Sequence, residues 1–258
     1  MKTSTSGVAT STRTPRSVFC TVPTMMPSAL ISRQRSKGTS ASDVAGLVAA
    51  FERIPALYIA DGHHRAASAA RTRQQIRSAA NFPGPWDAFL AVAFPDNQAQ
   101  ILPYNRVIKD LAGHTPASLL EAMRQVAGVT PGPAVPRRRG EVGMYLDGAW
   151  YAIDLGVAPS NLPAADRLDV SRLQDLILTP LLTIGDVRSD KRIDFVGGAR
   201  GTSELELRVR DGRAAVAFSM HPVGVDELMQ ISDDGGIMPP KSTWFEPKLR
   251  DGLLSHLI

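Results

Sequence analysis

The chain has 258 residues, of which 43% are apolar, and a formal net charge of +4. This size and composition suit one or two domains with a hydrophobic core and exclude a chain that is disordered throughout. The charge is divided unevenly, because residues 1–42 hold six basic and no acidic side chains, whereas residues 43–258 hold 23 basic and 25 acidic ones. The basic excess therefore belongs to the N-terminal segment, and a wholly basic protein that coats nucleic acid is not expected.

No apolar run approaches the roughly 20 residues that a membrane-spanning helix needs, and the N-terminus lacks the apolar middle of a secretory signal. We therefore expect a cytoplasmic protein with no membrane partner. Cys20 is the single cysteine, which excludes an internal disulfide and a zinc cage built from cysteines.

Residues 1–41 are rich in Ser, Thr, Arg and Pro and have no helical or strand periodicity. They predict a disordered basic leader, although the same composition also resembles an organelle transit peptide. Residues 42–258 form the predicted α/β domain. It begins with a helix from Ser42 to Ile54, which Pro55 ends.

Isolated strands and helices alternate along the rest of the chain and predict a mixed α/β (α+β) fold. The segment 128–140, rich in Pro, Gly and Arg, marks a possible boundary within the domain. Asp147-Gly148 between two alternating runs is the clearest hairpin signal. The predicted strands are 57–60, 88–94, 101–108, 141–146, 149–155, 193–196 and 214–219, and the predicted helices are 66–80, 116–126, 171–182, 202–210 and 226–231.

The densest group of chemically useful residues lies between a predicted strand and a predicted helix. Such a junction presents free backbone amides and the positive end of the helix dipole, which suit a phosphate. Glycine permits a close approach, arginine binds phosphate oxygens, and aspartate can hold magnesium or orient a histidine. The alternative is an ordinary helix start with a capping aspartate and surface histidines. The residues are Asp61, Gly62, His63, His64 and Arg65.

A second candidate segment is Pro240-Lys241-Ser242-Thr243. Gly236 followed by Lys241-Ser242 imitates a phosphate-binding P-loop, but Pro240 stands where that motif needs glycine, so the P-loop interpretation fails. A lysine and two hydroxyl groups held by prolines can still contact phosphate, and the alternative is a stiff surface connection.

Two further arginine sites are weaker. Arg106 follows an apolar strand and adds a candidate anion contact, although a solvated arginine is the commoner case. The run Arg137-Arg138-Arg139 is interpreted as a solvated charge run rather than as a nucleic-acid contact.

Four separated segments carry a family resemblance: residues 57–65 (LYIADGHHR), 101–107 (ILPYNRV), 191–198 (KRIDFVGG) and 238–248 (MPPKSTWFEPK). In this order they resemble the bacterial family known as domain of unknown function 1015, over the chain from about Asp43 to Ile258. That family is similar to the free-serine kinases, which share the fold of ParB nucleotide-binding and sulfiredoxin proteins.

The resemblance implies phosphoryl transfer from ATP or ADP to L-serine or a similar small hydroxyl substrate. It assigns the nucleotide phosphates and magnesium to Asp61, Gly62, His63, His64 and Arg65, with Asp61 as the metal ligand. Arg106 is a further candidate contact. Lys241, Ser242 and Thr243 resemble a segment that closes over the same site.

The catalytic base is the point where the resemblance fails. The serine kinases use a glutamate in a longer N-terminal region, and this sequence has no acidic residue before Asp43. The catalytic residues are therefore unknown, and we expect an N-terminally truncated family member. The alternative is a catalytically inactive nucleotide-binding module with a regulatory or interaction role, as in ParB-like domains. A nucleic-acid partner is not expected, because the predicted domain is slightly acidic and has no basic recognition helix.

Overall fold

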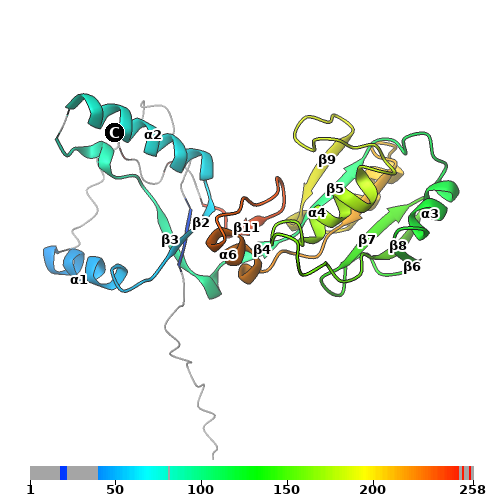
Figure 1. Cartoon of the computed structure of the whole chain (residues 1–258), viewed down its shortest axis with the longest axis horizontal. Coiled ribbons are helices and arrows are strands. Elements are labelled where there is room, and N and C mark those ends of the chain that lie inside the picture. Colours follow the sequence, from blue (N-terminus) through cyan, green and yellow to red (C-terminus); the bar gives the residue numbers. More distant parts are fainter. Residues whose placement is uncertain (1–17, 22–39, 81, 250–251, 253–255, 257–258) are drawn as a thin grey trace, which may run out of the picture. The chain divides into compact units, whose positions relative to one another are not determined.

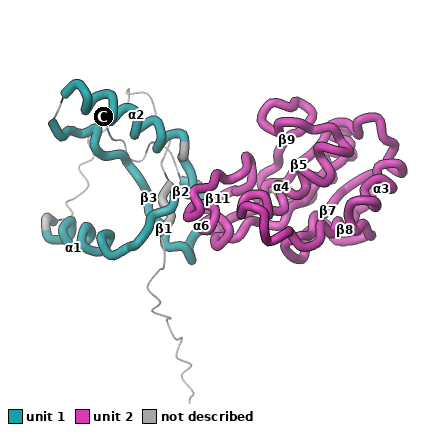
Figure 2. Tube along the Cα trace, viewed as in Figure 1, with its two compact units in different colours: residues 1–99, 247–258 teal, residues 100–246 magenta. Residues whose placement is uncertain are grey.

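The computed structural model describes residues 18–21, 40–80, 82–249, 252 and 256 (Figure 1). These residues form two compact units (Figure 2). Unit 1 is drawn from residues 1–99 and 247–258, and unit 2 is residues 100–246. The chain therefore divides after Ala99 and after Glu246, and the segment 128–140, where the sequence suggested a boundary, lies inside unit 2.

Unit 1 contains a three-stranded sheet in the order β2-β1-β3. Strand β1 (Val18–Thr21) runs parallel to β2 (Leu57–Asp61) and antiparallel to β3 (Val92–Pro95). The prediction of a disordered leader over 1–41 is wrong for the four residues of β1. Four residues are too few for periodicity to be detected, and hydrogen bonds from both neighbouring strands hold this segment at the centre of the sheet. The other residues of the predicted leader up to 39 lie outside the described residues.

Two helices belong to unit 1. Helix α1 (Ala41–Phe51) begins at Ser40, whose hydroxyl oxygen accepts a hydrogen bond from the Asp43 amide at 3.2 Å, so the cap lies two residues before the predicted Ser42. Its apolar residues Val44, Leu47 and Val48 are about half exposed. Helix α2 (His63–Ala80) is longer than the predicted helix and starts directly after Gly62. Its high alanine content accounts for its length.

Unit 2 is built on a six-stranded antiparallel sheet in the order β6-β8-β7-β10-β5-β9. The strands are β5 (Tyr104–Ile108), β6 (Gly128–Pro131), β7 (Glu141–Leu146), β8 (Ala149–Asp154), β9 (Ile193–Gly197) and β10 (Val216–Ser219). The hairpin of β7 and β8 around Asp147-Gly148 is confirmed, and both turn residues have positive φ, as a two-residue hairpin turn requires.

The helices of unit 2 cover the sheet and its ends. They are α3 (Pro116–Arg124), α4 (Asp169–Leu173), α5 (Ser203–Arg210) and α6 (Val225–Asp233). Leu205 of α5 packs in a buried cluster with Val107, Tyr145 and Ala217 on one face of the sheet. Because side chains alternate along a strand, Arg106, Phe195 and Phe218, which are paired across β5, β9 and β10, lie on the opposite face.

Proline divides one predicted strand. Residues 101–108 were predicted as one strand, but β4 (Gln100–Leu102) and β5 are separated by Pro103, which has no N–H to donate to a ladder. Strand β4 instead pairs with β11 (Trp244–Glu246), which the sequence did not predict. The predicted helix 171–182 is the short α4 followed by a π-helical segment, Gln174–Leu178.

The fold class is therefore mixed α/β, as predicted, while the ParB/sulfiredoxin description stays a prediction. Within the part of the chain that the structure describes, the helices are all too short or too polar to cross a lipid bilayer.

Candidate functional site

The strand-to-helix junction of unit 1 has the local geometry that its sequence predicts. Strand β2 ends at Asp61 and α2 begins at His63, with Gly62 between them at a φ of 87°. The Gly62 carbonyl accepts the Ala66 amide at 2.9 Å, which closes the first helical turn. Gly62 is buried and His64 is exposed. A glycine is needed here because other residues adopt this backbone conformation only with strain.

Asp61 is held on both sides. Its Oδ1 accepts the Gly62 amide at 2.7 Å, and its Oδ2 lies 3.2 Å from the Lys248 ammonium. Burial raises the pKa of the Asp61 carboxyl, but the charge and hydrogen bond of Lys248, the Gly62 amide and the charge of Arg65 together lower it below its ordinary value. Asp61 is therefore ionised at neutral pH. Lys248 belongs to the run 238–248 that the sequence singled out, but it was not among the predicted site residues.

Replacing Lys248 with methionine is expected to raise the pKa of Asp61, since burial would then act with less opposition. In the native chain the lowered pKa stabilises the fold above the unfolded-state pKa, and this stabilisation is lost as the pH falls through the folded-state pKa. An NMR titration of the Asp61 carboxyl carbon measures the shift. Lys191→Met, which alters an exposed lysine of unit 2, is the control. An unchanged Asp61 pKa in Lys248→Met would contradict the assigned cause.

Replacing Gly62 with alanine is expected to destabilise unit 1 by about 1–2 kcal/mol, the usual penalty for a side chain in the left-handed region. Gly46→Ala in α1 is the matched control, because an added Cβ there meets nothing within 4 Å and alanine favours a helix interior. Urea unfolding followed by circular dichroism measures both. Equal stabilities of the two variants would show that φ at Gly62 is unimportant.

In unit 2, two predicted residues that lie far apart in the sequence meet. The Nη2 of Arg106 donates to the Lys241 carbonyl at 3.2 Å, and its Nη1 donates to the Tyr104 carbonyl. Arg106 is only 3% exposed and lies 5.6 Å from the centre of the Phe195 ring. Burial lowers its pKa to about 10. The idea that Arg106 is a solvated surface arginine is therefore wrong.

Aromatic rings surround these two cations. The Lys241 ammonium lies 5.3 Å from the centre of the Tyr104 ring, within cation–π range. Tyr104 in turn contacts Phe195 and Trp244 edge to face, with ring centroids 6.0 and 5.5 Å apart. We call Tyr104, Arg106, Phe195, Lys241 and Trp244 the Arg106–Lys241 cluster. The sequence did not predict the aromatic members, although Tyr104 lies two positions before Arg106 and Trp244 directly follows Thr243.

The backbone of the 240–243 segment is tightly constrained. Lys241 has a φ of 55°, which is uncommon for a residue with a side chain. Ser242 is buried, with 3% exposure, whereas Thr243 is half-buried. The segment therefore presents the lysine outward and turns the serine into the protein, so Ser242 is not presented as an exposed hydroxyl group.

The cluster holds positive charge without matching negative charge. Among the described residues, no carboxylate forms an ion pair with Arg106 or Lys241. The contacts of these two cations are with aromatic rings and backbone carbonyls, while the Glu246 carboxylate accepts a hydrogen bond from the Trp244 indole at 2.7 Å. Such a site can bind an anion through the exposed Lys241 ammonium, while the hydrogen bond from Arg106 to the Lys241 carbonyl fixes the lysine backbone.

Metal binding has less support in the geometry. The described residues include no group of three or more His, Cys, Asp or Glu side chains arranged to hold a metal ion. Both oxygens of Asp61, the predicted magnesium ligand, already accept hydrogen bonds. The described residues therefore do not form a metal site without oxygen atoms from a ligand.

The model of the family described as "Protein of unknown function (DUF1015)" matches residues 34–171. The chain belongs to this family. The match spans the 61–65 junction and Arg106, while Lys241 to Thr243 lie beyond it. No curated protein sequence matches the chain.

Several solved structures are similar at low identity. A free serine kinase in complex with AMP is 13% identical, with a TM-score of 0.42 and 81% of each chain covered. A mutant of a free serine kinase, also in complex with AMP, is 14% identical, with a TM-score of 0.40. The similarity covers 73% of this chain and 67% of that chain. A conserved hypothetical protein from Pyrococcus furiosus is 15% identical, with a TM-score of 0.42. The similarity covers 76% of this chain and 72% of that chain.

Proposed function

We propose that the chain binds the phosphate groups of a nucleotide. The observation that carries this proposal is the pairing of Arg106 with Lys241, 135 positions apart, in a cluster where neither cation has a carboxylate partner among the described residues. Burying a cation is unfavourable unless an anion or several hydrogen bonds compensate. A phosphate bound at the Lys241 ammonium would supply the missing negative charge.

The 61–65 junction supports the same ligand class independently. The first amides of α2, an 18-residue helix, have no acceptor within the helix, and the helix dipole favours an anion there. Arg65 lies in the first turn, where a guanidinium can bind phosphate oxygens in a bidentate manner. His64 is proposed as a further donor from the same turn, while the side chain of His63 lies outside the described part of the structure.

The nucleotide is proposed to be ATP or ADP, with L-serine or a similar small hydroxyl compound as acceptor. This step is supported by the four family-like motifs and by no contact in the structure. Phosphoryl transfer needs charge neutralisation, in-line placement and a base for the hydroxyl group. Arg65 and Lys241 are candidates for the first role. Magnesium would arrive with the phosphates, since it is usually bound through one or two carboxylates together with substrate oxygens, and Asp61 is the carboxylate proposed here.

A second function is a catalytically inactive nucleotide-binding module. It is favoured by one observation from the sequence: none of residues 1–42 is acidic, so these residues offer no candidate for the glutamate that the serine kinases use. The two functions share the binding step and differ only in turnover.

Thermal unfolding with ATP, ADP and AMP, each with and without magnesium, tests the binding step. The expected result is a rise in melting temperature that is reduced in Arg65→Ala and in Lys241→Ala but kept in the exposed-lysine control Lys191→Ala. If none of these nucleotides stabilises the wild-type chain, both functions are excluded.

Turnover is tested by measuring phosphoserine formed from L-serine and ATP or ADP. Product above the level of an Arg65→Ala/Lys241→Ala double variant supports the kinase. Nucleotide binding without product supports the inactive module.

A further inference from the structure

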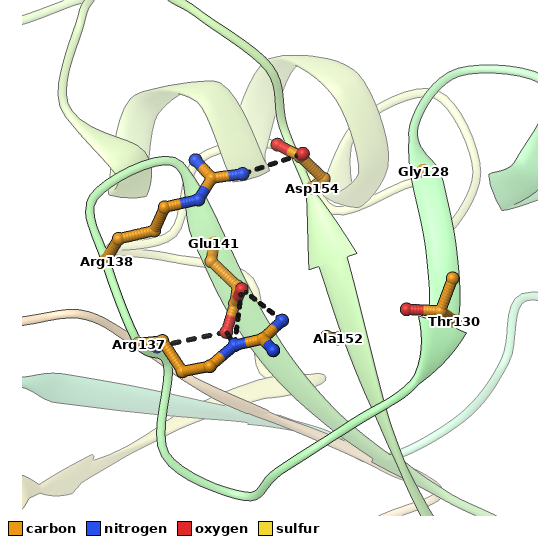
Figure 3. A pocket seen from close by; sticks show the side chains of 7 residues that line it. All are labelled: Gly128, Thr130, Arg137, Arg138, Glu141, Ala152 and Asp154. Atoms are coloured by element: carbon orange, nitrogen blue, oxygen red, sulfur yellow. Dashed lines mark hydrogen bonds and ion pairs between the residues drawn. The ribbon is translucent and has the colours of Figure 1, made fainter.

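Two hollows flank the loop of residues 132–140 in unit 2, and they differ in how their charges are paired. The first has a volume of about 600 Å³ and lies between this loop and strands β6, β7 and β8 (Figure 3). Within it Arg137 binds the buried Glu141 carboxylate at 2.8 Å, and Arg138 binds Asp154 at 2.7 Å. Each carboxylate thus has its own arginine, and this hollow needs no ligand. The side chains of Arg137, Arg138 and Arg139 are 68%, 55% and 49% exposed, as expected of a solvated charge run, and each also pairs with a carboxylate.

The second hollow, which we call the Arg167 groove, has a volume of about 380 Å³. The loop 132–140, the segment leading into α4, and helices α4 and α6 line it. Its charged lining residues include Arg138, Arg139, Arg167, Arg172, Asp169 and Glu227. Arg139 is already paired, since it lies 2.8 Å from Asp226 and 3.4 Å from Glu227.

The other two arginines of the groove lack a carboxylate. The side chain of Arg167 makes no hydrogen bond or ion pair with any described residue, and its Nε is buried without an acceptor. Arg172 donates to the Gly156 carbonyl at 2.6 Å and to the Leu155 carbonyl, and it has no ion pair within the described part of the chain. The buried Nε leaves Arg167 with an unmet need for an acceptor, because burying an unpaired donor is unfavourable.

The carboxylate beside these arginines does not fill that need. Both carboxylate oxygens of Asp169 accept a hydrogen bond from the Gly140 amide, at 2.9 and 3.0 Å. Burial raises the pKa of the Asp169 carboxyl, and the charge of Glu227 adds to this effect, while the Gly140 amide, His221 and Arg172 oppose it. Among the described residues Asp169 forms no ion pair with Arg167 or Arg172, so both guanidinium groups can still bind an added anion.

We propose that the Arg167 groove binds a small oxyanion, a carboxylate or phosphoryl group, between Arg167 and Arg172. The planar guanidinium group matches the oxygens of both kinds of anion. The volume lies near the lower end of the range for small-molecule sites, roughly 300–1,000 Å³, which suits a metabolite-sized anion rather than a peptide. None of the lining residues belongs to the 61–65 junction or to the Arg106–Lys241 cluster, so this site is independent of the proposed nucleotide site.

The test is a titration of the ¹⁵N-labelled full chain with inorganic phosphate and, separately, with malonate, followed by NMR. The expected result is a saturable shift of the Arg167 Nε–Hε resonance and of the Val157 and Ala158 amides, which line the groove. The Nε–Hε resonance of Arg124, an arginine on α3 that is half exposed, is expected to stay unchanged. Saturation by phosphate alone identifies a phosphoryl ligand, and saturation by malonate alone identifies a carboxylate ligand.

Three variants complete the test. Arg167→Gln is expected to abolish the saturable shifts at Val157 and Ala158, and Arg124→Gln to keep them. Asp169→Asn, which removes the nearby negative charge but retains an acceptor for the Gly140 amide, is expected to bind the anion several-fold more tightly. The proposal is overturned if the shifts persist in Arg167→Gln, or if no probe shifts the groove resonances. Shifts confined to the Gly62 amide would also overturn it while supporting the nucleotide site, so the two proposals fail separately.

Discussion

Replacing Arg106 with methionine is expected to weaken nucleotide binding by about tenfold to a hundredfold. The buried guanidinium holds the Lys241 carbonyl, and hydrogen bonds from charged groups contribute roughly 1.5–3 kcal/mol, which corresponds to one to two factors of ten in affinity. Without this contact the 240–243 segment loses the support that fixes the lysine ammonium.

The free energy of unfolding is expected to change much less in this variant, by about 1–2 kcal/mol in either direction. Methionine removes a cation that is buried without a counter-ion, which is favourable, but leaves two carbonyls without their donor, which is unfavourable. Calorimetric titration with the nucleotide and urea unfolding measure the two effects. Arg210→Met, at an arginine whose side chain is 62% exposed, is the control. Wild-type affinity in Arg106→Met would show that Arg106 does not position Lys241.

Replacing Gly197 with alanine is expected to destabilise unit 2 by about 1–3 kcal/mol, the usual range for overpacking. An added Cβ at this position would lie 2.5 Å from ring atoms of Trp244, so the indole must move. Because Trp244 contacts Tyr104, whose ring faces the Lys241 ammonium, nucleotide affinity is expected to fall as well. Urea unfolding and tryptophan fluorescence measure the change.

A double-mutant cycle separates this effect from a general loss of stability. In a Trp244→Ala background the added methyl group has room, so Gly197→Ala is expected to have a smaller effect there. Gly185→Ala is the matched control, since its added Cβ meets nothing within 4 Å. If the penalty at Gly197 is the same in both backgrounds, the close packing against Trp244 is not its cause.

The parts of the fold that depend on local sequence could be predicted. The β7–β8 hairpin follows from Asp147-Gly148 between two alternating runs, and the start of α2 follows from Gly62 and the alanines after it. Strand β1 could not be predicted, because its stability comes from β2 and β3, which lie more than 30 positions away. The division of residues 101–108 was visible at Pro103, but the partner of β4 was not.

The candidate site follows the same rule. The residue types at 61–65 and 240–243 indicated phosphate chemistry, and Arg106 was among the candidates. Its burial and its bond to Lys241 could not be predicted, because they depend on how β5 packs against a segment 135 positions later. The aromatic rings were missed because Tyr104, Phe195 and Trp244 come from three separate strands. The Arg167 groove has no local signature, because the lack of ion pairs at Arg167 and Arg172 depends on how the surrounding segments pack.

The pairing of β4 with β11 brings the first and last strands of unit 2 together, and this has a consequence for biosynthesis. While the chain leaves the ribosome, Arg106 is made more than 130 residues before its acceptor on Lys241, and β4 more than 140 residues before β11. The contact of Asp61 with Lys248 in unit 1 must also wait, because Lys248 is translated 187 positions after Asp61. The Arg106–Lys241 contact therefore forms only after translation has passed residue 241, and the Asp61–Lys248 contact only after it has passed residue 248.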